Sequence, residues 1–215
     1  MKSKQERSSL FKTFQSQIKC KDKFEEGKIN LLQLRKELKE IDDYIFANCE
    51  KKDYCIMPLK SDKTIAYYLY HLTRIEDITS NTLILGKKQV FFENKYDSLL
   101  SSPIKTTGNE LKRDQLVQFS LSLDINQLKH YVDDVYANTN QLINQMNFKE
   151  SRLKVKDVRK NDLIKLNVVS TDENAFWLVD YWCKKTYAGL FLMPFSRHQM
   201  LHLDGCLRIM HKIKK

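Results

Sequence analysis

Glycine and proline are scarce in this sequence of 215 residues, which contains 5 glycines and 3 prolines. A β-sandwich or a β-barrel needs many tight turns, and these two residues are among the commonest in such turns. The scarcity therefore predicts an all-α fold, in which long helices are joined by few loops. The length suits one sizeable domain or two small ones.

The sequence also lacks long apolar runs and paired cysteines. No apolar run reaches the about 18 residues of a membrane-spanning helix, and the N-terminal stretch has no apolar segment of the signal-peptide kind. The 5 cysteines include no CxxC pair, and their odd number argues against a disulfide framework. Reduced thiols fit better, and we therefore expect a cytoplasmic protein.

Positive charge is in excess, with a formal net charge of +10. This charge is compatible with an anionic partner such as nucleic acid, a membrane surface or an acidic small molecule. However, the two most basic stretches, residues 1–28 and 149–165, both mix lysine and arginine with acidic residues. Mixed-sign segments are more typical of solvated helix faces than of a polybasic arm. Binding to nucleic acid is therefore kept as an alternative only.

Apolar residues recur at helical spacing in several stretches. Residues 1–27 predict a short amphipathic helix, and a capping-box pattern at Ser170 and Glu173 predicts the start of another. Ser61 or Asp62 is expected to begin a helix that Gly86 ends. The connector over residues 149–168 suits a short helix or an edge strand. The longest expected helices cover residues 30–48, 62–86, 124–146 and 194–213.

Three of the five histidines are predicted to lie on helix faces that point into the core. His198 and His202 are four residues apart, so they lie one turn above each other on the expected last helix. His71 lies on the apolar stripe of the helix over residues 62–86. By the same helical phase, His130 and His211 are expected to face solvent.

An HxxxH pair with a third inward histidine can bind one divalent metal ion. His198 is expected in the first turn after Pro194, where the positive end of the helix dipole disfavours the imidazolium form. Neutral imidazole is the form that a metal needs. Three nitrogen ligands with water in the remaining position are typical of an open, catalytic type of zinc site.

Three segments carry a resemblance to a known family: YHLTRIED, TTGNE and VDYWCKKTYAGLFLMPFSRHQMLHL. With them, roughly residues 30–213 resemble the DinB/YfiT-like superfamily of metal-binding four-helix bundles, which includes bacillithiol-dependent and mycothiol-dependent transferases. The family's three histidine ligands map onto His71, His198 and His202 without departure. The resemblance implies a single domain over residues 1–215, with a bundle over 28–215 and an N-terminal helical extension over 1–27.

The resemblance also implies chemistry. One divalent ion per chain is expected, with zinc or nickel as the metal, and so is a homodimer. A bound low-molecular-weight thiol would give S-transfer to a small substrate, whereas bound hydroxide would give hydrolysis. A non-catalytic metal-binding or stress-response protein is the alternative, because family membership fixes a fold better than a reaction.

Further residues are candidates for supporting roles near the metal, and each has a structural alternative. Asp180 could accept a ligand's ring N–H or pair with Lys184. Arg197 could hold an anionic group of a substrate or form a surface ion pair. Tyr67, Tyr68 and Tyr187 could line a pocket or simply pack. Glu76 is about 140° around its helix from His71, so it is not expected to bind the metal, and pairing with Arg74 or a neighbouring chain is expected instead.

Overall fold

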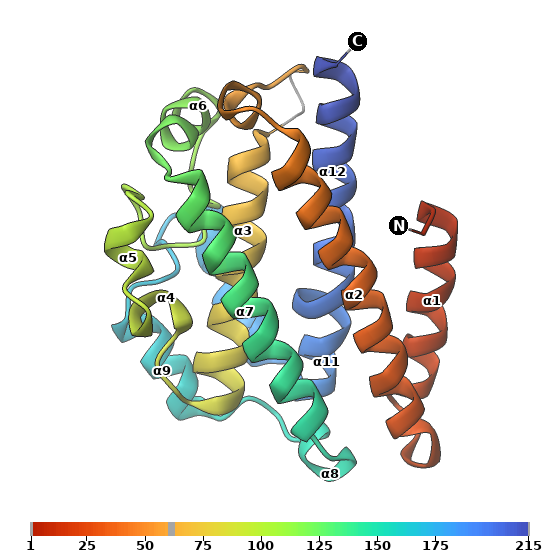
Figure 1. The fold of residues 1–215 in the computed structure, drawn as a ribbon. Coiled ribbons are helices and arrows are strands. Elements are labelled where there is room, and N and C mark those ends of the chain that lie inside the picture. The colour runs from red at the N-terminus through yellow and green to blue at the C-terminus, as the bar shows by residue number, and fades with distance from the viewer. Residues whose placement is uncertain (1, 60–62, 215) are drawn as a thin grey trace.

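A computed structural model describes residues 2–59 and 63–214, and the regular secondary structure in these ranges is helical (Figure 1). Extended backbone pairs there only at an isolated bridge between Lys154 and Thr186. The all-α class is therefore confirmed. No helix in the described ranges is both long enough and apolar enough to cross a membrane.

Four long helices form the centre of the fold: α2 (Phe24–Asn48), α3 (Ile65–Asp77), α7 (Ile125–Gln145) and α12 (His198–Ile213). They pack in the cyclic order α2, α7, α3, α12, each against the next (Figure 1). The apolar stripe predicted for α7 faces this core, because Leu128, Val135 and Leu142 are all buried. Each of the four predicted long helices is present, and α2 begins several residues earlier than expected.

The ends of α3 are fixed by local hydrogen bonding and by one glycine. Ser61 and Asp62, the expected N-caps, lie outside the described residues, and Thr64 caps the helix by accepting a hydrogen bond from the Tyr67 N–H at 3.1 Å. The chain continues as a π-helix, Ile78–Leu85, which ends at Gly86 with φ at +64°. A residue with a side chain rarely adopts this left-handed conformation, so the predicted stop at Gly86 is confirmed.

The N-terminal segment packs on the bundle. Helix α1 (Lys4–Gln17) lies against the outer side of α2 (Figure 1). Its Phe11 and Phe14 side chains are buried. The buried guanidinium of Arg7 forms an ion pair with Asp204 of α12 at 2.5 Å. This segment therefore contacts two of the four central helices.

Shorter elements make the connections between the central helices. The connector predicted over residues 149–168 contains short helices and no edge strand. The predicted capping box at Ser170 and Glu173 is wrong, because Asp172 is the N-cap and accepts a hydrogen bond from the Asn174 N–H at 2.9 Å. The shorter connecting elements are the 3-10 helices Lys21–Lys23 and Lys51–Cys55, α4 (Val90–Glu93), α5 (Tyr96–Leu99), α6 (Arg113–Ser122), α8 (Phe148–Ser151), α9 (Asp157–Lys165), α10 (Glu173–Cys183), α11 (Tyr187–Leu192) and the π-helix Met193–Arg197.

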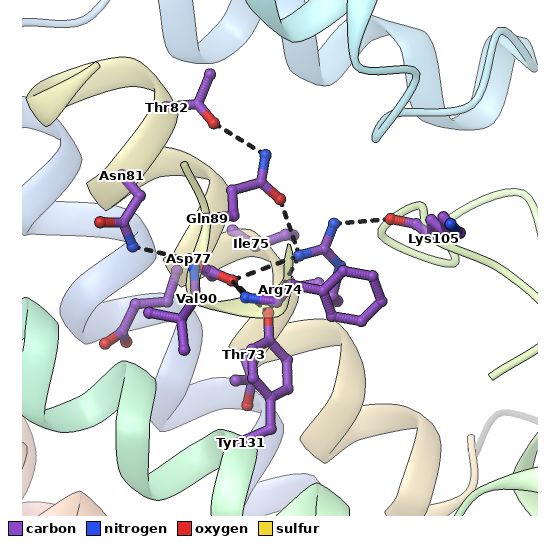
Figure 2. A network of polar contacts seen from close by, with 12 residues as sticks. Thr73, Arg74, Ile75, Asp77, Asn81, Thr82, Gln89, Val90, Lys105 and Tyr131 are labelled. Carbon is purple, nitrogen blue, oxygen red and sulfur yellow. Dashed lines mark hydrogen bonds and ion pairs between the residues drawn. The ribbon is translucent and has the colours of Figure 1, made fainter. Parts of the chain in front are cut away.

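Helix α3 is buried on almost every side, including its charged residues. Arg74 and Asp77 are both fully buried, and their charged groups lie 3.6 Å apart (Figure 2). The Asp77 carboxylate accepts hydrogen bonds from the backbone N–H groups of Val90 and Phe91 at the start of α4 and from the hydroxyl of Tyr131 on α7. A buried charge needs such partners. This network fixes α4 and α7 relative to α3.

Candidate metal centre

The packing of α3 against α12 brings the three predicted histidines together. The Nε2 atoms of His71 and His198 lie 3.2 Å apart, and those of His198 and His202 lie 2.9 Å apart. One ligand atom from each residue fits within a span of 4.8 Å, so the group is positioned to hold a metal ion. His130 and His211 are exposed, as helical phase predicts.

A backbone carbonyl holds the ring of His71 in a ligating orientation. The Nδ1 atom of His71 lies 2.7 Å from the carbonyl oxygen of Thr107. A carbonyl can only accept a hydrogen bond, so Nδ1 carries the hydrogen and Nε2 is left with a free lone pair. Sequence reasoning missed the role of Thr107, although the residue belongs to the TTGNE segment that carries the resemblance. Gly108 follows it with φ at +77°, where a Cβ atom would lie 3.1 Å from the ring of Tyr67.

Helix α3 fixes the loop that carries this carbonyl. The Tyr70 hydroxyl donates to the carbonyl oxygens of Ile104 and Thr106 at 3.0 and 3.1 Å. Arg74, one turn further along α3, donates to the carbonyl oxygen of Lys105 at 2.7 Å (Figure 2). The loop is therefore held at consecutive residues, which keeps the acceptor for His71 in place.

The hydrogen-bonding capacity of the histidines fits a cation better than a proton. His71 Nε2 is an acceptor, and His198 Nε2 has close contacts with both neighbouring Nε2 atoms. If His198 Nε2 carries a hydrogen, it can donate to one neighbouring histidine but has no lone pair with which to accept from the other. If His198 Nε2 carries no hydrogen, it can accept from His202, but its lone pair then faces the lone pair of His71. One proton thus satisfies only one of the two contacts well. A metal ion would accept all three lone pairs.

Burial keeps the three imidazoles neutral. It lowers the pKa of His71 to about 4 and, with the nearby His71, the pKa of His202 to about 3. The pKa of His198 also falls well below its ordinary value, first through burial and then through the two neighbouring histidines. The expected neutral state of His198 is therefore present, but burial is its main cause. The π-helix Met193–Arg197 precedes His198, so this residue does not stand at a free helix terminus.

A cavity of about 570 Å³ adjoins the three histidines. Tyr67 stacks on His71 with ring centres 5.3 Å apart, and Tyr68 stacks on His202 at 5.0 Å. Both tyrosines line the cavity, as the sequence suggested, and the aromatic rings of α10 complete its walls. Tyr187 does not line the cavity. Its side chain is buried elsewhere, at the start of α11, where its backbone N–H donates to the Leu153 carbonyl oxygen.

Two further candidates lie away from the histidines. Asp180 forms an exposed ion pair with Lys160 at 2.6 Å, so its predicted support of a ligand is wrong in this arrangement, and so is the alternative pairing with Lys184. Arg197 is exposed and does not line the cavity. Both residues are on helices next to the site, but their side chains point outward because helical phase carries them away from the core.

Glu76 has a structural role that links the central helices. Its carboxylate forms a bidentate ion pair with Arg35 of α2, at 2.7 and 3.0 Å, and accepts a hydrogen bond from Gln199 of α12 at 2.8 Å. Arg35 also donates to Asn140 of α7 at 2.6 Å. The expected pairing of Glu76 with Arg74 is therefore wrong. This network joins all four helices beside His198.

Asp42 lies beside the same network and is the basis of a pH prediction. It is buried, its Oδ1 atom has no hydrogen-bond partner in the described ranges, and burial raises its pKa to about 8. An unfolded aspartate ionises near pH ~4, so the folded protein binds more protons between these values. The protonated Asp42 carboxyl group therefore contributes to the free energy of unfolding at low pH, and this contribution is lost as the pH rises toward 8.

We therefore expect Asp42→Asn to flatten the decrease in the free energy of unfolding above about pH 5. Urea denaturation followed by circular dichroism at a series of pH values measures this slope. The exposed Asp114 of α6 provides a control, since Asp114→Asn should leave the slope as in the wild type. An unchanged slope in Asp42→Asn would contradict the raised pKa.

No family model matches the sequence, and no curated protein shows significant similarity to it. The function is therefore inferred from the chain's own residues. These place three neutral imidazoles together in the lining of a partly aromatic cavity.

Proposed function

We propose that this chain is a DinB-like metalloprotein in which His71, His198 and His202 hold one divalent ion, zinc or nickel. Its proposed activity is thiol S-transfer or hydrolysis on a small substrate. The convergence of three Nε2 atoms within 4.8 Å is the observation that carries this proposal. The resemblance of the three sequence segments to the DinB/YfiT-like superfamily supports it independently of the geometry.

The residues around the histidines favour a reactive site over a purely structural one. Structural zinc sites have four protein ligands, whereas catalytic sites have three and keep a position open. The described residues offer three histidines, and the cavity beside them has a volume typical of small-molecule sites. When bound, the ion would lower the pKa of a thiol or a water molecule in its open position.

The chain's own groups would orient the reactants and limit water. Thr107 fixes the ring of His71, and Tyr67 and Tyr68 cover the rings of His71 and His202. The aromatic walls give an organic substrate apolar surface on which to pack. Thiol transfer is favoured over hydrolysis by the resemblance, and metal binding without catalysis is the alternative.

The experiment compares zinc-loaded and metal-free protein in two assays. In the first, a low-molecular-weight thiol such as bacillithiol or cysteine is mixed with a chlorodinitroarene. Transfer forms a carbon–sulfur bond and releases chloride, and the thioether is followed by its absorbance. In the second, a carboxylic ester reports hydrolysis.

We expect the loaded protein to accelerate one of these reactions, and His71→Ala to abolish the acceleration. The exposed His211 supplies the control variant His211→Ala, which should retain the full rate. Metal-loaded protein that leaves both substrates unchanged would favour the non-catalytic alternative. The homodimer and the cytoplasmic location stay predictions, the former testable by solution scattering.

A further inference from the structure

The cavity beside the histidines has an unbalanced charge. Among the described residues that line it, Lys63 is the single lysine or arginine, and no aspartate or glutamate is present. An imidazole binds a metal in its neutral form, so three histidine ligands would leave the charge of a bound divalent ion uncompensated. A site with excess positive charge and low-dielectric walls favours an anionic ligand.

Lys63 is placed to meet such a ligand. Its Nζ atom lies 5.5 Å from the centre of the Tyr67 ring, and the same ring stacks on His71. Partial burial lowers the pKa of Lys63, and the nearby cation Arg113 adds to this effect. The ammonium group therefore faces the cavity next to the metal-binding end, where an anion would stabilise it.

Aromatic residues of α10 also line the cavity. Among them, Trp177 is 52% exposed and lies beside Tyr181 in the lining. Its indole N–H donates to the Asn174 carbonyl oxygen at 3.0 Å, so the polar edge is satisfied within its own helix. Tyr181 packs edge-on against it at 5.6 Å. The Nζ atom of Lys185 lies over the Tyr181 ring at 4.4 Å and covers one of its faces, whereas the exposed indole of Trp177 remains available to pack against a flat apolar molecule.

We propose that the substrate of this site is an apolar or aromatic acid, with its anionic group paired to Lys63 and its body packed against Trp177 and Tyr181. This inference rests on the proposed function, because the reactive end of the substrate would lie at the histidines. Lys63 is a positioning residue that selects the charge of the substrate. The aromatic wall selects its shape.

The test uses two probes of the same shape on zinc-loaded protein, 3-(2-naphthyl)propanoate and its uncharged primary amide. Isothermal titration measures their affinities, and elemental analysis measures zinc in every variant. A charge-assisted hydrogen bond in a partly buried site contributes about 1.5–3 kcal/mol. We therefore expect the wild type to bind the acid at least about tenfold more tightly than the amide.

Four variants separate the parts of the proposal. Lys63→Met should remove the preference for the acid, and Lys63→Arg should keep it. Trp177→Ala should weaken both probes to the same extent. Lys12→Met removes one exposed positive charge from α1 and should bind both probes like the wild type.

The outcomes distinguish this inference from the proposed function. If zinc is bound at one ion per chain but Lys63→Met keeps the preference for the acid, the role of Lys63 is overturned and the metal site stands. If neither probe binds the zinc-loaded protein at millimolar concentration, the substrate class is overturned. A wild-type protein that binds no zinc would overturn the proposed function itself.

Discussion

Replacing His71, His198 or His202 singly with alanine is expected to lower the affinity for zinc by at least about a hundredfold. Loss of an outer hydrogen-bond partner alone typically lowers metal affinity ten- to a hundredfold, and loss of a ligand should do more. The physical reason is that two imidazoles cannot supply the three lone pairs that converge here. Elemental analysis of protein purified without an affinity tag, followed by competition with a chelating dye, measures the effect.

The two remaining histidines supply matched controls for this experiment. His130 and His211 are both exposed, so His130→Ala and His211→Ala should retain one ion per chain with unchanged affinity. Retention of zinc by all three core variants would show that the histidines do not bind it. Equal losses in the core and control variants would indicate that the ion binds elsewhere.

Arg35→Met is expected to lower the free energy of unfolding by about 3–5 kcal/mol, because it leaves a buried carboxylate without its ionic partner. The pair that Arg35 forms with Glu76 has exposed fractions of 3% and 5% for the two side chains. Methionine fills a similar volume without the charge. Within residues 2–59 and 63–214, Gln199 alone would still donate a side-chain hydrogen bond to Glu76.

The exposed ion pair between Lys160 and Asp180 is the matched control for this prediction. Its N–O distance is 2.6 Å, similar to that of the buried pair, but its side chains are 40% and 58% exposed. Exposed pairs are screened by water, so Lys160→Met should leave the free energy of unfolding close to that of the wild type. Urea denaturation of both variants provides the comparison. Similar losses in the two variants would mean that burial does not set the strength of these pairs.

The sequence by itself determined the helical class, the order of the long helices and the inward phase of the three histidines. These properties depend on local composition and on helical periodicity, and both can be read directly from the order of the residues. The helix end at Gly86 could likewise be predicted, since glycine readily adopts the positive φ that a helix end often needs and that is observed there. Periodicity also separated the three core histidines from His130 and His211.

Tertiary structure alone decided which polar groups are partners. Other elements pack around helix α3 on almost every side, so Arg74, Glu76 and Asp77 are all buried. An amphipathic pattern would instead predict a solvated face for some of these charged residues. Their partners come from α2, α4, α7 and α12, at sequence separations that no local pattern encodes. The support of His71 by the Thr107 carbonyl was missed for the same reason, because any residue can supply a carbonyl.

At the candidate site too, the sequence determined some features and the tertiary structure decided the others. Helical phase predicted that His71, His198 and His202 point inward, but only the packing of α3 against α12 determined that their Nε2 atoms meet. Asp180 and Tyr187 were candidates for the site but lie outside it, because a position on a neighbouring helix does not fix the direction of a side chain. Lys63 and Trp177 line the same cavity although they are far apart in the sequence, and that juxtaposition exists only in the folded chain.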